Sequence, residues 1–152
     1  MEDKKMIKTV SFKDLDVWKN AHKFVLQVYK LTEIFPKSEL FGLVSQFRRA
    51  SVSIAANIAE GYKKKSKLDK LRFFNIAQGS LEECHYYVIL SKDLNYFDEN
   101  AENELYIKIE TIGKMLNSYC KKIENNFCLQ KNQSPNPQLL SSNFQLLTSN
   151  PL

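Results

Sequence analysis

The strongest constraint on this chain is the spacing of its apolar residues, which recur in alternating steps of four and three positions along four long segments. One face of an α-helix repeats in this way, whereas one face of a β-strand repeats every second residue. Gly and Pro occur only four times each, and three of the four prolines lie beyond residue 134. Sandwiches, barrels and α/β folds need many more such turn residues, so we predict an all-α fold.

The apolar stripes and their flanking residues define four helices joined by short links. We expect the helices at about residues 14–35, 38–60, 66–95 and 98–127. The expected N-caps are Ser11 or Asp14, Ser38, Ser66 and Asp98. Pro36 should end the first helix, because the residue before a proline avoids the helical conformation. Short links make successive helices antiparallel, which predicts an up-down-up-down four-helix bundle over residues 11–127, after a flexible N-terminus at 1–10.

Two glycines carry specific expectations. Gly61 follows the second stripe and is a natural residue to end that helix in the left-handed conformation. Gly79 lies in the middle of the third helix, where glycine costs up to about 1 kcal/mol relative to alanine. A close crossing by another helix would explain Gly79, and random tolerance of a glycine at this position is the alternative.

Residues 128–152 have a different composition, rich in Asn, Gln, Ser, Leu and Pro. Residues 137–143 (PQLLSSN) and 144–150 (FQLLTSN) form a seven-residue repeat. The prolines and the lack of charge argue against a coiled coil, so we interpret this region as a disordered, low-complexity tail. The alternative is a peptide that docks on a partner through its leucine pairs, Leu139, Leu140, Leu146 and Leu147.

The net charge of +5 is concentrated in residues 36–65, which hold six Lys and Arg against two Asp and Glu. A cluster of cations binds a polyanion by releasing its counterions, and a nearby aromatic ring can stack on a base. The candidate nucleic-acid contacts are Arg48, Arg49, Tyr62, Lys63, Lys64, Lys65, Lys67 and Lys70. The alternatives are a solvated lysine loop, and pairing of the two arginines with Glu60, Glu82 or Glu83.

Catalytic patterns are weak. His22 and His85 fall on different predicted helices, and neither has a carboxylate or thiol at metal-ligand spacing. No phosphate-binding glycine loop occurs. We therefore predict no enzymatic activity, no metal and no cofactor, and a nuclease is a less favoured alternative.

Three widely spaced cysteines, Cys84, Cys120 and Cys128, are typical of free thiols in a reducing compartment. No apolar run approaches the roughly 20 residues of a membrane span, and the charged first residues do not resemble a signal peptide. We therefore expect a cytoplasmic protein with no membrane partner.

Several aromatic residues lie off the apolar stripes: Trp18, Tyr29, Phe41, Phe73, Tyr86 and Tyr87. They either widen the buried helix faces or form contacts between subunits, since interfaces favour aromatics.

A series of longer phrases carries a family resemblance. They are SFKDLDVW at 11–18, LTEIFP at 31–36, ELFGLVSQFRRA at 39–50, SIAANIAEG at 53–61, FNIAQGSLE at 74–82 and DLNY at 93–96. Together they resemble the bacterial four-helix bundle family encoded in intervening sequences of large-subunit ribosomal RNA genes. A relative of that family is the accessory variability protein of diversity-generating retroelements. The resemblance covers roughly residues 11–125.

The resemblance implies a ring-shaped homopentamer. For the retroelement relative, it implies that a basic surface binds nucleic acid and a reverse transcriptase. Members often carry an Arg after the Ala-Glu-Gly phrase, whereas this chain has Tyr62 followed by three lysines. The positive charge is kept, but the planar guanidinium fork that contacts a phosphate through two bonds is not.

We therefore predict a non-enzymatic bundle that self-assembles, as a pentamer, and binds RNA or DNA through a basic surface. The alternative is a structural or protein-binding module that docks on a protein partner such as a reverse transcriptase.

Overall fold

The computed structural model describes the backbone of residues 10–131 and the side chains up to residue 125. Its four α-helices are α1 (Asp16–Leu31), α2 (Leu43–Lys63), α3 (Lys67–Asp93) and α4 (Glu99–Lys131). Three single turns of 3-10 helix accompany them: η1 (Phe12–Asp14), η2 (Thr32–Ile34) and η3 (Lys37–Glu39). No strand occurs within residues 10–131, so the all-α prediction is confirmed.

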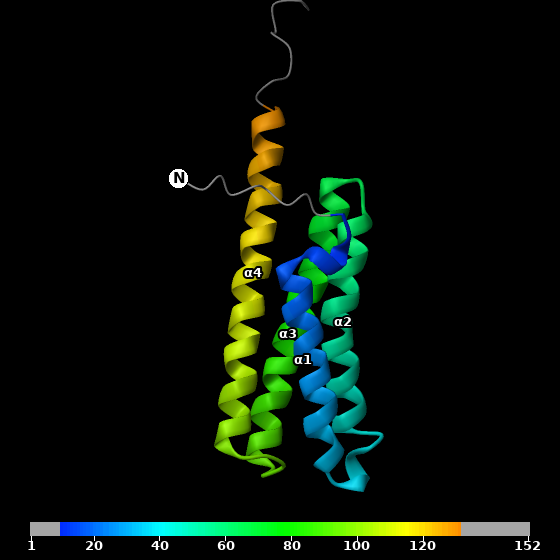
Figure 1. Cartoon of the computed structure of the whole chain (residues 1–152), viewed down its shortest axis with the longest axis vertical. Helices are drawn as coiled ribbons and strands as arrows, with labels where there is room; N and C mark the ends of the chain where they lie inside the picture. Colours follow the sequence, from blue (N-terminus) through cyan, green and yellow to red (C-terminus); the bar gives the residue numbers. More distant parts are fainter. Residues whose placement is uncertain (1–9, 132–152) are drawn as a thin grey trace, which may run out of the picture.

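The helices form an antiparallel bundle with up-down-up-down connectivity (Figure 1). Each helix packs against its neighbours in sequence, and α1 contacts α4 to close the bundle. The α2–α3 turn lies at the end where α1 begins and α4 leaves the bundle, and α4 extends past the other helices there (Figure 1). Over residues 10–131, no helix combines the length and the apolar character that a membrane span needs.

The predicted stripes form the core. Seven of the largest fully buried side chains come from the stripes of α1, α2 and α4: Phe24, Phe47, Ile54, Ile58, Leu105, Ile112 and Leu116. Helix α3 contributes Phe74, Ala77, Leu81, Cys84 and Val88 to the same core. Burial of these side chains against one another is the main force that holds the bundle together.

The first helix is shorter than predicted at both ends. Ser11 and Asp14 together cap η1, and Asp14 Oδ2 accepts hydrogen bonds from the backbone N–H groups of Ser11 (2.9 Å) and Val10 (3.0 Å). These bonds hold the pKa of the Asp14 carboxyl below its usual value. Helix α1 therefore begins after η1, at Asp16, and its last turns tighten into η2 before the extended Phe35 that precedes Pro36.

The second helix begins at Leu43, not near Ser38, so the expected Ser38 cap is wrong. Residues 37–39 form η3 instead, and Glu39 Oε2 accepts a hydrogen bond from Leu43 N (3.1 Å). Glu39 Oε1 accepts a second bond, from the Tyr96 hydroxyl (2.9 Å). Glu39 thus accepts a hydrogen bond from the first backbone N–H of α2 while Tyr96 holds its carboxylate in place. The local sequence could not reveal the contact with Tyr96, which is 57 residues away.

The expectation for Gly61 is wrong, and the close crossing expected at Gly79 does not occur within the protomer. Gly61 lies inside α2 with a negative φ, and a Cβ there would come 3.0 Å from Phe73 Cβ and 3.4 Å from Phe74 Cε1. Its missing side chain thus lets α3 start close to the end of α2. At Gly79, in contrast to the crowded Gly61, an added Cβ would meet no atom within 4 Å. No helix of this protomer crosses closely at Gly79.

The last two helices begin as predicted. Ser66 Oγ accepts a hydrogen bond from Asp69 N (3.4 Å), and Asp98 Oδ1 accepts one from Ala101 N (2.9 Å). Helix α4 continues to Lys131, beyond the predicted end at residue 127. The predicted tail overlaps this last turn, and its residues 132–152 lie outside the described part of the chain, as do residues 1–9 of the predicted flexible N-terminus.

Candidate nucleic-acid interface

The α2–α3 turn presents the lysine cluster predicted from the sequence. Helix α2 ends at Lys63, Lys64 takes an extended conformation, and Ser66 caps α3. Because the turn is this short, lysines project from the last residues of one helix, from the turn and from the first residues of the next. Lys63 and Lys65 are exposed, and Lys67 is half-buried.

Two lysines of the cluster are held along the protein surface. Lys64 Nζ lies 3.3 Å from Glu60 Oε1 and 4.5 Å from the centroid of the Phe73 ring. Lys70 Nζ donates a hydrogen bond to the Tyr62 carbonyl (2.9 Å) and lies 5.8 Å from the centre of the Tyr62 ring. Tyr62 itself is half-buried and packs against the core. The cluster therefore combines tethered ammonium groups with others that extend into solvent.

Arg48 and Arg49 lie apart from the lysine cluster. Lys63 lies fifteen positions after Arg48 in α2, a distance of about 22 Å along the helix axis. The predicted contacts therefore form two separate groups along the bundle, at the α2–α3 turn and near the start of α2.

The two arginines have different environments. Arg48 Nε donates to the buried Thr32 Oγ1 (2.8 Å), its Nη2 donates to the Tyr29 carbonyl (3.2 Å), and its guanidinium lies 4.7 Å from the centre of the Tyr29 ring. These contacts join α2 to the end of α1. Arg49 is 73% exposed, and its Nη2 lies 4.0 Å from Glu83 Oε1. A pair that long and exposed adds little stability.

The sequence of residues 13–118 matches a model of the 23S rRNA-intervening sequence protein family. The chain belongs to this family. The match includes α1, α2, α3 and most of α4, together with all the predicted contact residues. It confirms the resemblance carried by the sequence phrases.

A solved structure agrees with the family match. The crystal structure of a protein with unknown function from the S23 ribosomal protein family of Bacteroides thetaiotaomicron has a TM-score of 0.65 to this chain at 24% identity. The alignment covers 69% of this chain and 95% of that one. At this identity the likeness shows the fold. No curated protein matches the chain, and neither match indicates an enzyme family.

Within residues 10–125, the two histidines and the cysteines Cys84 and Cys120 are not assembled into a reactive site. His22 stacks on Trp18 among apolar side chains. His85 Nδ1 lies 3.7 Å from Glu82 Oε2 in a shallow groove between α3 and α4, and Glu82 is largely exposed. Burial raises the pKa of the Cys84 and Cys120 thiols, which makes the reactive thiolate rarer. No group of three potential metal ligands occurs among the described side chains.

Further exposed lysines, which were not among the predicted contacts, lie near the α2–α3 turn. Lys121 and Lys122 are exposed on α4, close to Tyr119, whose ring lies 6.2 Å from that of Phe74 near the start of α3. Lys13 is exposed and belongs to η1, the segment before α1, which lies at the same end of the bundle (Figure 1). The predicted connectivity contained this signal, since it places the start of the first helix and the end of the fourth beside the second turn. We call this end, formed by the α2–α3 turn, η1 and the end of α4, the basic end.

Proposed function

We propose that this family member is a non-enzymatic protein that self-assembles and binds RNA or DNA through the basic end. The observation that carries the proposal is the gathering of exposed ammonium groups there, from the turn (Lys63, Lys65) and from α4 (Lys121, Lys122). Grouped cations repel one another, and a nucleic acid backbone relieves the repulsion while its counterions are released.

The contacts at the basic end favour phosphate over base recognition. The Tyr62 ring is half-buried and has Lys70 Nζ 5.8 Å from its centre, so little of the ring is offered to a base. Lysine is a point charge and contacts a phosphate without the fixed fork geometry of arginine. We therefore expect affinity with little sequence preference, because phosphate contacts carry no sequence information.

Self-assembly is supported by apolar side chains that this protomer leaves exposed on the outer face of α3, interspersed with the charged residues Arg72 and Glu82. They are Leu68, Ile76, Tyr86 and Ile89. Gly79 lies on the same face, and its open surroundings leave room for a close helix approach from a second copy. The family resemblance sets five as the expected number of subunits.

A matched pair of charge variants tests nucleic-acid binding. The variant Lys63→Glu/Lys64→Glu/Lys65→Glu should lose binding, whereas Lys30→Glu/Lys37→Glu/Lys92→Glu, at the opposite end, changes the net charge equally and should keep most of it. For the unaltered protein, the affinity should fall steeply with salt, with each neutralised phosphate adding about 0.7–0.9 to the log–log slope. Equal losses in the two variants would show that only overall charge matters and would refute the basic-end site.

Light scattering tests self-assembly. Tyr86→Lys places a charge on the exposed face of α3 and should reduce the particle mass toward that of one 17.7 kDa chain. Lys23→Glu, an exposed change on α1, is the control and should leave the mass unchanged. A monomeric unaltered protein, or an unchanged mass in Tyr86→Lys, would contradict the assembly proposed on this face.

A second candidate function is docking on a protein partner such as a reverse transcriptase. The exposed apolar residues Ile34, Leu40 and Phe41 favour it, and Phe41 is 91% exposed. Such an interface would show weak salt dependence and sensitivity to Phe41→Ser. The lysine variants would leave it intact, which separates it from nucleic-acid binding.

A further inference from the structure

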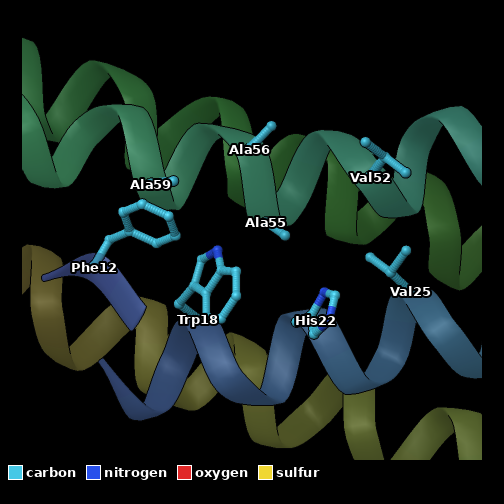
Figure 2. Close-up of a pocket in the computed structure, with 8 residues that line it drawn as sticks. All are labelled: Phe12, Trp18, His22, Val25, Val52, Ala55, Ala56 and Ala59. Carbon is cyan, nitrogen blue, oxygen red and sulfur yellow. The ribbon is translucent and has the colours of Figure 1, made fainter. Parts of the chain in front are cut away.

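An apolar groove runs between α1 and α2, on a face distinct from the exposed face of α3 (Figure 2). Its volume is about 390 Å³. The lining residues come from η1, α1 and α2: Phe12, Trp18, His22, Val25, Val52, Ala55, Ala56 and Ala59. His22 is the single titratable group among these eight residues. A ligand for the groove must therefore be apolar and needs no charge.

The two walls of the groove explain why it stays open. Helix α2 contributes mainly alanines, whose methyl groups do not reach across to α1 (Figure 2). The opposite wall is aromatic: the Trp18 ring is stacked on His22 with centroids 5.1 Å apart and receives the edge of Phe12 at 5.0 Å. Mutual packing holds these rings in place before any ligand arrives.

We propose that the C-terminal segment of the same chain, residues 132–152, binds in this groove through its leucine pairs. This segment contains no Asp, Glu, Lys or Arg, and its seven-residue repeat carries Leu139-Leu140 and Leu146-Leu147. An uncharged peptide with paired leucines matches a groove that offers apolar surface and no ion-pair partner. The inference goes beyond nucleic-acid binding and does not depend on it.

The chain geometry permits the segment to return. Asn20 Nδ2 lies 3.7 Å from Met115 Sδ, so the start of α1 is level with that part of α4, and the helix from Met115 to Lys131 adds about 24 Å. The chain from Lys131 to Leu146 spans up to about 52 Å when extended. Helix α4 leaves the bundle at the end where η1 and the start of α1 form the aromatic wall (Figure 1). The second leucine pair can therefore reach Trp18 without any change in the bundle.

Trp18 reports directly on the occupant, because it is the single tryptophan of the chain. In the full-length protein, replacing Leu139, Leu140, Leu146 and Leu147 by Ser should expose the ring. We expect about a twofold rise in the constant for fluorescence quenching by acrylamide, together with a red shift, because the ring loses its apolar cover. The control replaces Ser141, Ser142, Thr148 and Ser149 by Ala and should change neither quantity.

A groove variant provides an independent arm. Ala56 is exposed in the groove, so Ala56→Glu should fold while placing a charge where the leucines would bind. It should raise Trp18 quenching as the leucine variant does, and combining the two should add nothing further. Circular dichroism confirms that helicity is kept.

Three results would overturn the proposal. One is unchanged Trp18 quenching in the leucine variant. Another is protection that depends on protein concentration and survives loss of the leucines, which would assign the groove to a second copy of the bundle. The third is protection that needs the leucines but disappears on dilution, which would mean that another chain supplies the segment.

Discussion

At the end opposite the lysine turn, the α1–α2 and α3–α4 connections contact one another, whereas the basic end has one short connection, the α2–α3 turn, with Lys63 and Lys65 exposed. We call the former the closed end. There the buried Phe35 ring lies 5.0 Å from Tyr96 and 6.0 Å from Phe97, and the Tyr96 hydroxyl donates to Glu39. The basic end instead carries like charges, which cost stability unless a partner neutralises them. Packing therefore explains the residues of the closed end, whereas the exposed lysines of the basic end contribute little to the core.

The largest effect should come from removing the aromatic centre of the closed end. Phe35→Ala should lower the free energy of unfolding by about 3–5 kcal/mol, because a buried ring is replaced by a cavity. Phe41→Ala deletes the same group six positions along the chain from an exposed site and should cost less than about 0.5 kcal/mol. Urea denaturation measures both, and similar losses would contradict the contrast between the buried and exposed rings.

The sequence predicted the bundle well because the spacing of apolar residues within each helix is local, and the residues so spaced are the ones buried in the core. The stripe from Leu105 to Ile123 lies on the inner side of α4, as expected. The start of α2 could not be predicted, because Glu39 is fixed by Tyr96 through a contact 57 residues apart. Gly61 likewise serves a side chain of the next helix, Phe73, and not its own backbone conformation.

The candidate site was predicted in part. The lysine turn was visible as a run of residues, but the α4 lysines belong to it only through the connectivity of the bundle. Arg48 was predicted to contact nucleic acid, with pairing to a glutamate as the alternative, and its guanidinium donates hydrogen bonds to Thr32 and to the Tyr29 carbonyl. A hydroxyl and a backbone carbonyl leave no charge pattern in a sequence, so that role could not be predicted.

Glycine variants compare the close α2–α3 contact near the basic end with an open helix face. Gly61→Ala should destabilise the protein by about 1 kcal/mol, because a Cβ 3.0 Å from Phe73 Cβ outweighs the gain in helix propensity. Gly79→Ala meets nothing within 4 Å in the protomer and should add up to about 1 kcal/mol. Thermal unfolding at low protein concentration measures both changes. Stabilisation by Gly61→Ala would show that Phe73 moves away easily.

A pH series examines the hydrogen bond between Tyr87 and Glu83, on the half of α3 that leads to the closed end. Burial, and then the bond that the Tyr87 hydroxyl donates to Glu83 (2.7 Å), raise the pKa of Tyr87 to about 12. Above about pH 10 the unfolded chain loses this proton while the folded chain keeps it, so stability falls as the pH rises toward 12. Tyr87→Phe should cost about 1 kcal/mol near pH 8, and its deficit should shrink over that range. A constant deficit would contradict the raised pKa.

The smallest effect on the free energy of unfolding is expected for the exposed lysines of the proposed binding site. Lys63→Ala/Lys65→Ala should change the free energy of unfolding by less than about 0.5 kcal/mol, because both side chains are exposed. The direction is also informative: removing two of several neighbouring cations relieves repulsion, so any change should be a slight gain that disappears in about 1 M salt. Lys64→Ala is the comparison, since this lysine pairs with Glu60 and covers Phe73. A large loss of stability in the double variant would mean that these lysines support the fold. Their presence at the basic end would then be explained without a ligand.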